Sequence, residues 1–158
     1  MPEHLKETLH ILNAREKKPI LKAISDQWGV DFRPEVMLMS NKNKVYITTP
    51  ELNQVEWHKY KVDGVGLYIA RMENEVRLSI EGAQLIGPLA KKNVVTVTDE
   101  ETRTWFRGED IAVEDDRLKG LSGYVILRNK DDFLGSGKVS GGKILNFVPK
   151  GRRITSQI

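Results

Sequence analysis

Apolar side chains recur with a helical period in the first part of the chain. Four of them share one face of a predicted helix: Ile20, Leu21, Ile24 and Trp28. Asn13 followed three residues later by Glu16 predicts a capping box, and Gly29 predicts a left-handed C-terminal end. Pro19 favours a regular helix that begins closer to Lys18, because proline is tolerated best in the first turn.

Beyond Pro34 the apolar period changes from helical to extended. Four β-rich runs follow in two pairs joined by polar turns: residues 36–40 with 44–48, and residues 66–71 with 75–79. Pro50 and Glu51 predict a short helical turn that extends through Val55. The first half therefore predicts an α+β unit of one helix and four strands.

From residue 80 onward the predicted elements are short and glycines are frequent. A helical turn at 81–88, a strand at 93–97 and a helix at 100–106 precede three strands at 123–128, 133–139 and 143–148. Thr98 or Asp99 can cap the helix, Gly108 ends it, and Gly141 with Gly142 forms a tight hairpin turn. We expect an α+β protein with a small α+β domain in residues 1–76 and a small pseudo-β-barrel in residues 77–158.

Composition narrows the chemistry. The 158 residues include no cysteine, which excludes disulfides, thiolate metal sites and cysteine nucleophiles. No apolar run approaches the ~20 residues that cross a bilayer, and residues 1–7 are not a signal peptide, so we expect a cytoplasmic protein without a membrane partner.

Sequence motifs for catalysis or cofactor binding are absent. The three histidines lack metal-ligand spacing, and the glycines near Ser136 fit neither a nucleophile elbow nor a phosphate loop. The acidic runs at 99–101 and 114–116 are contiguous, so their carboxylates diverge instead of sharing a proton. We therefore expect no enzyme activity, no metal and no cofactor.

Charge is distributed unevenly along the chain. Residues 1–118 carry 17 basic and 20 acidic side chains, whereas residues 119–158 carry eight basic and two acidic ones. A field of that kind draws a polyanion to one end of the molecule, although a solvated basic tail is the simpler alternative. If the last strands are neighbours, we expect their cations to share one rim. The candidate RNA contacts are Lys91, Lys92, Arg128, Lys130, Lys138, Lys143, Asn146, Lys150, Arg152 and Arg153.

Two aromatic residues lie among these cations. Tyr124 and Phe147 can either pack in the core or stack on bases, and Lys91 and Lys92 can either extend the rim or face water.

Several segments resemble a known RNA-binding module. They are residues 78–88, 105–110, 123–128 and, most specifically, the closing stretch from Phe133 to Arg153. This pattern is similar to the C-terminal PUA-like region of bacterial rRNA cytosine-C5 methyltransferases of the Fmu/NOL type. The layout also resembles small archaeal ribosome-biogenesis factors. The resemblance implies a PUA fold and RNA contact by Lys138, Lys150, Arg152 and Arg153, while Arg128, Lys130 and Lys143 join on charge alone.

One departure from that family changes the expected function. Those methyltransferases attack cytosine with a cysteine, and this chain has none. We therefore expect the RNA-binding part standing alone, a non-catalytic protein that recognises structured rRNA or tRNA in ribosome biogenesis or RNA modification. The alternative is an adaptor that docks on a ribosomal protein or RNA-modifying enzyme through the acidic first half, including Glu51, Glu56 and Asp63. A hydrolase or transferase would need a convergent site that the sequence does not reveal.

Overall fold

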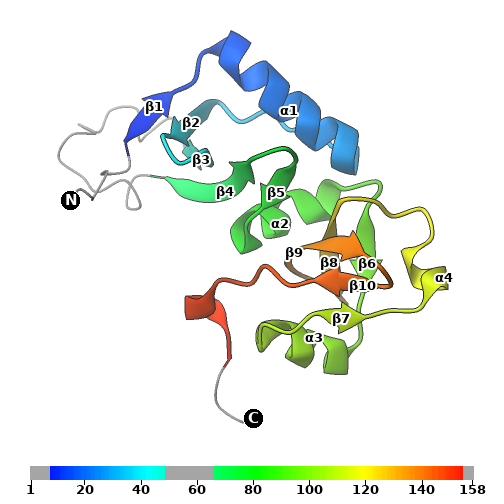
Figure 1. Ribbon diagram of the computed structural model, residues 1–158. Coiled ribbons are helices and arrows are strands. Elements are labelled where there is room, and N and C mark those ends of the chain that lie inside the picture. The colour runs from blue at the N-terminus through cyan, green and yellow to red at the C-terminus, as the bar shows by residue number, and fades with distance from the viewer. Residues whose placement is uncertain (1–7, 49–65, 155–158) are drawn as a thin grey trace.

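The first lobe of the protein is an antiparallel sheet with one long helix on it (Figure 1). The computed structural model describes residues 8–48 and 66–154. In chain order the elements are β1 (Leu9–Ile11), α1 (Ala14–Trp28), β2 (Val36–Ser40), β3 (Lys44–Thr48), β4 (Leu67–Met72) and β5 (Val76–Leu78). The strands lie side by side in the order β1–β2–β3–β4–β5. The two predicted hairpins are confirmed.

The second lobe is a half-closed barrel built on a five-stranded mixed sheet. Its elements are α2 (Ile80–Ile86), the 3-10 turn η4 (Gly87–Leu89), β6 (Val94–Thr96), α3 (Asp99–Phe106), β7 (Ile111–Ala112), α4 (Asp115–Leu118), β8 (Tyr124–Asn129), β9 (Asp132–Ser140), β10 (Lys143–Leu145) and the 3-10 turn η5 (Lys150–Arg152). The strand order is β6–β8–β9–β10–β7, with β6 parallel to β8 and the other neighbours antiparallel. The α+β class is confirmed.

Residues at its two ends determine where α1 starts and ends. Asn13 and Glu16 form the predicted capping box, and Gly29 ends the helix at φ +70°. The predicted start near Lys18 is wrong: the helix begins at Ala14 and Pro19 lies inside it. The capping box holds the first turn. Pro19 and Arg15 are both exposed, so water can reach the Arg15 carbonyl that proline leaves unbonded.

Some predictions differ from the structure, and others concern features that the described residues do not test. The sequence prediction missed the short strands β1 and β7, and the last strand ends at Leu145 instead of residue 148. The predicted helical turn from Pro50 to Val55 lies outside the described residues. The division into domains 1–76 and 77–158 stays a prediction. Within residues 8–48 and 66–154, no helix combines the length and apolarity that a membrane crossing requires.

Strand β8 joins the two hydrophobic cores. Tyr124 and Ile126 face the first core, which contains the apolar face of α1, whereas Val125 and Leu127 face the core of the barrel. Because side chains alternate along a strand, a run of four apolar residues is buried on both sides. The lobes therefore share a strand instead of being joined only by a linker.

Helix α2 lies between the lobes and approaches both closely. A Cβ at Gly82 would lie 2.0 Å from the backbone oxygen of Ile69 in β4, and one at Gly87 would lie 2.2 Å from the ring of Phe133 in β9. Buried Ser136 donates a hydrogen bond to the Leu78 carbonyl at 2.8 Å, which joins β9 to β5 beside this helix. Glycine at these two positions therefore sets how near the sheets can come.

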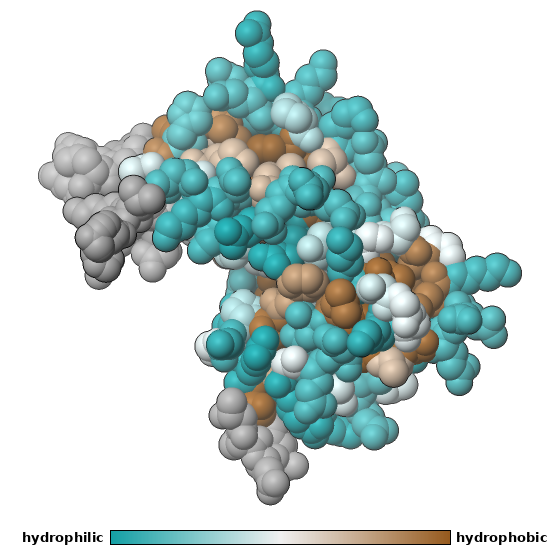
Figure 2. Space-filling model, viewed as in Figure 1, coloured by the Kyte–Doolittle hydropathy of each residue, from teal (hydrophilic) through white to brown (hydrophobic). Residues whose placement is uncertain are grey.

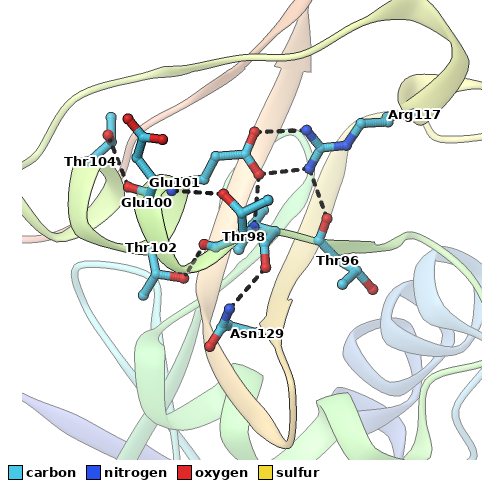
Figure 3. A network of polar contacts seen from close by, with 9 residues as sticks. Thr96, Thr98, Glu100, Glu101, Thr102, Thr104, Arg117 and Asn129 are labelled. Carbon is cyan, nitrogen blue, oxygen red and sulfur yellow. Dashed lines mark hydrogen bonds and ion pairs between the residues drawn. The ribbon is translucent and has the colours of Figure 1, made fainter.

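A polar network fixes the start of α3 (Figure 3). Thr98 and Glu101 form a capping box, and both carboxylate oxygens of Glu101 accept hydrogen bonds from Arg117 at 2.7 and 2.8 Å. Arg117 also donates to the Thr96 carbonyl at the end of β6. These hydrogen bonds lower the pKa of Glu101, with the bond from Arg117 as the largest cause. The network holds α3, and with it Trp105, against the sheet.

We expect Gly82→Ala to destabilise the fold by about 2–3 kcal/mol, because the new methyl group meets backbone rather than a movable side chain. Gly151→Ala is the matched control, since nothing lies within 4 Å of a Cβ there. Urea unfolding of both variants tests this. Equal stability of the two would contradict the close approach of α2 to β4.

We expect Glu101→Gln to cost about 1–2 kcal/mol at neutral pH, because it removes the charge that Arg117 binds. Since the folded pKa of Glu101 is lowered, its contribution is complete above the ordinary value of 4.5 and is lost as the pH falls through the folded value. The stability gap between the wild type and Glu101→Gln should therefore shrink on acidification. Glu100→Gln, at an exposed neighbour in the same turn, is the matched control.

Candidate nucleic-acid interface

The predicted cations do not share one rim. Strands β8, β9 and β10 are neighbours as predicted, but β8 and β9 are antiparallel and joined by a turn at residues 130–131. Arg128 pairs with Phe133 near that turn, whereas Lys138 pairs with Tyr124 at the opposite end of the ladder. The single-rim prediction is therefore wrong, because the hairpin puts Arg128 and Lys130 at one end of the sheet and Lys138 at the other.

The hairpin-turn end of the sheet is locally balanced in charge. Arg128 lies 3.9 Å from a carboxylate oxygen of Asp131 and its guanidinium lies over the Phe133 ring at 5.3 Å. Lys130 lies 3.4 Å from Asp99, whose pKa is lowered by hydrogen bonds from Asn129 first and from Lys130 second. These cations face acids instead of adding to a positive surface.

The remaining outlying cations lie in two further places. Lys143 begins β10, with its amine 4.0 Å from Asp110. Lys91 and Lys92 are exposed beside the C-terminal end of α1, where the Lys91 amide donates to the Trp28 carbonyl at 2.8 Å. RNA contact by these three lysines stays a prediction.

Four side chains form a continuous stack where the lobes meet. The Lys138 amine lies 5.5 Å from the centre of the Tyr124 ring, and that ring meets Phe147 edge-on at 5.4 Å. The Arg77 guanidinium from β5 lies over Phe147 at 4.8 Å. Glu75 binds Lys138 at 3.1 Å, and this hydrogen bond raises the pKa of the lysine. Both lobes therefore contribute charge to the same aromatic pair.

The C-terminal turn brings three more cations to this part of the molecule. Arg152 lies 2.9 Å from Glu81 of α2, and Lys150 is exposed in the same turn. The Nε of Arg153 donates to the Val148 carbonyl at 3.0 Å, and its side chain lies close to Gly108. We call Arg77, Lys138, Lys150, Arg152 and Arg153 the interlobe cluster.

Carboxylates reduce but do not cancel the positive charge of the interlobe cluster. Its five cations are accompanied by Glu75 and Glu81. Both ion pairs are partly open to solvent, with side-chain exposures of 40% and 43% for Lys138 and Glu75, and 49% and 31% for Arg152 and Glu81. Exposed pairs are worth about 0–1 kcal/mol, so a phosphate can replace either glutamate at little cost. In Figure 2 hydrophilic residues run across the line where the lobes meet.

The side-chain amide of Asn146 forms hydrogen bonds with backbone groups of the protein. Its amide nitrogen donates to the carbonyls of Trp105 and Glu109 at 2.7 and 2.9 Å, and its amide oxygen accepts from the Val148 amide at 2.8 Å. Its own backbone N–H donates to Asp110. Asn146 therefore sets the path of the C-terminal segment, and the proposed interface does not include it.

Sequence reasoning missed Arg77, the cluster member from the first lobe. Its alternation with buried Val76 and Leu78 indicates a side chain on the other face of β5, but the sequence gives no sign that Phe147 lies beneath it. Tyr124 is buried in the first core and Phe147 packs half-buried against that core, so Phe147 keeps a partly open ring. Among the described residues, no three His, Asp or Glu side chains are grouped to hold a metal. The acids of the adaptor alternative, Glu51, Glu56 and Asp63, lie outside the described residues.

Comparisons with known proteins agree with the observed fold. Residues 92–154 match the family described as the methyltransferase RsmF PUA domain. The chain is 29% identical over 140 residues to the ribosomal RNA small subunit methyltransferase F of Aeromonas hydrophila, and 27% identical over 140 residues to that of Aeromonas salmonicida. Each match covers 88% of this chain but only 28% of the relative.

A solved structure has the same fold. It is a conserved PUA domain protein from Thermoplasma acidophilum, which matches with a TM-score of 0.57 at 14% identity over 89% of this chain and 93% of its own. The predicted PUA-like fold and resemblance are therefore confirmed: residues 92–154 match the RsmF PUA domain, and the chain shares its fold with a PUA domain protein. The matched family covers that module and not a catalytic domain.

We expect Asn146→Ala to destabilise the protein by about 2 kcal/mol, because it leaves backbone groups of Trp105, Glu109 and Val148 without their partner. Hydrogen exchange at the Val148 amide should accelerate in step. Lys143→Ala, an exposed change in the strand that precedes Asn146, should alter stability by less than about 0.5 kcal/mol. Unchanged stability together with weaker RNA binding would make Asn146 an RNA contact, as the sequence suggested.

Proposed function

We propose that this chain is a non-catalytic, cytoplasmic RNA-binding protein that recognises structured rRNA or tRNA through the interlobe cluster. The observation that carries the proposal is the convergence of cations from both lobes on one aromatic pair, with Lys138 over Tyr124 and Arg77 over the half-buried ring of Phe147. Cations bind phosphates, and an aromatic ring beside them offers a stacking surface for a base. The PUA fold supports the same function.

Small-subunit rRNA is the first RNA to test. The relatives are named ribosomal RNA small subunit methyltransferases, and the chain resembles 28% of their length. With no cysteine anywhere in the sequence, a cysteine nucleophile cannot operate in this chain. Its role would then be to hold RNA during ribosome biogenesis or RNA modification, beside an enzyme or ribosomal protein that acts on the same RNA.

The charge geometry predicts how binding responds to salt. If the five cations of the interlobe cluster meet four or five phosphates, log affinity falls against log salt concentration with a slope of about −4. The phosphate contacts position the RNA and carry little sequence information, so unrelated RNAs of similar shape should share this slope.

We expect the double variant Lys150→Gln/Arg152→Gln to weaken binding about tenfold near 0.1 M salt and to flatten the slope by about 2. Fluorescence anisotropy with an RNA hairpin that carries a single-stranded overhang measures both quantities. The matched control is Arg128→Gln/Lys130→Gln, which removes the same charge at the other end of the sheet and should have little effect. Equal losses in the two double variants would contradict the interlobe cluster and favour an unspecific basic surface.

A further inference from the structure

A small pocket opens between the lobes beside the interlobe cluster. Its volume is about 120 Å³, and it lies between β5, the start of α2, strand β9 and the C-terminal segment. Phe147, Ile80 and Leu78 supply much of its apolar wall. Exposed Pro149 and Arg152 mark its mouth.

An unpaired hydrogen-bond donor faces this pocket. Trp105 is fully buried, and within the described residues no group accepts a hydrogen bond from its Nε1–H. A Cβ at Gly135 would lie 3.9 Å from Trp105 Nε1 and 3.4 Å from Ile80, so the missing side chain of Gly135 leaves a narrow space beside this buried atom. All three residues line the pocket. A buried donor without an acceptor lowers stability, so a ligand that supplies an acceptor is stabilised there.

Other polar groups around the pocket already have partners within the protein. Ser136 donates to the Leu78 carbonyl, and Ser79 donates to the Tyr68 carbonyl while its oxygen accepts from the Gly82 amide. Arg77 lies over the Phe147 ring at the edge of the pocket. The pocket thus combines one inward donor, an aromatic wall and guanidinium groups near the mouth.

We infer that this pocket receives one unpaired pyrimidine base of a bound RNA. The pocket is smaller than the cavity of about 150 Å³ that admits a benzene ring, so it excludes a purine and takes at most one six-membered ring at its open mouth. Both uracil and cytosine carry a carbonyl oxygen at C2 that can accept from Trp105 Nε1–H. Arg77 and Arg152 would then meet the phosphates on either side of the inserted nucleotide. This inference rests on the proposed function and adds a base-binding subsite to it.

The indole N–H gives a direct readout in the full chain. We expect an eight-residue oligouridine to shift the Trp105 Nε1–H resonance in ¹⁵N-edited NMR spectra and to leave that of Trp28 in place. An octamer of abasic ribose phosphates should bind the interlobe cluster without moving the Trp105 signal. Oligoadenosine of the same length should also leave the signal in place.

Trp105→Phe and Trp28→Phe form a matched pair of variants. Both tryptophans are fully buried and both Nε1 atoms lack an acceptor among the described residues, but Trp28 packs inside the first core. We expect Trp105→Phe to weaken oligouridine binding about five- to tenfold and Trp28→Phe to leave it unchanged. Both variants also assign the two resonances.

The outcomes separate this inference from the proposed function. RNA binding without a shift at Trp105, or with the same shift for the abasic octamer, would overturn the base pocket and leave the interlobe cluster intact. An equal shift with oligoadenosine would overturn the choice of a pyrimidine. Failure of every RNA to bind would overturn both proposals.

Discussion

The contact of α2 with both sheets is the constraint on which the rest of the structure depends. Gly82 of α2 rests on the backbone of β4, at a distance that leaves no room for a side chain, and Gly87, which follows α2, rests on the ring of Phe133 in β9. Because interiors are close-packed, a methyl group at Gly82 would push the lobes apart instead of being absorbed. That spacing lets Arg77 of β5 reach the ring of Phe147, and lets Glu75 reach Lys138.

The same geometry explains why charge along the sequence differs from charge in space. The antiparallel β8–β9 hairpin moves Arg128 and Lys130 away from Lys138 and places them beside acids. Arg77 comes from the part of the chain whose net charge is negative, yet it joins the positive cluster. An electrostatic interface is therefore defined by what surrounds each cation after folding.

Sequence predicted the local structure well because local rules decide it. The capping box at Asn13, a cap at Thr98 or Asp99, the Gly141–Gly142 turn and the apolar run of β8 are set by neighbours a few residues away. Strands of two or three residues such as β7 carry too short a pattern to be recognised. The site was predicted only in part because its members meet through tertiary packing. Nothing near Trp105 in the sequence indicates that its indole N–H faces a pocket, and nothing near Asn146 shows that backbone groups occupy its amide.

The central claim is that RNA lies where the two lobes meet, on Phe147 and the cations around it. Ultraviolet crosslinking of the intact chain to RNA, with the crosslinked residues identified by mass spectrometry, tests it most directly. We expect crosslinks within Phe147–Arg153 and at residues of β5 near Arg77. Crosslinks confined to the turn between β8 and β9, or to the outer face of α1, would contradict it.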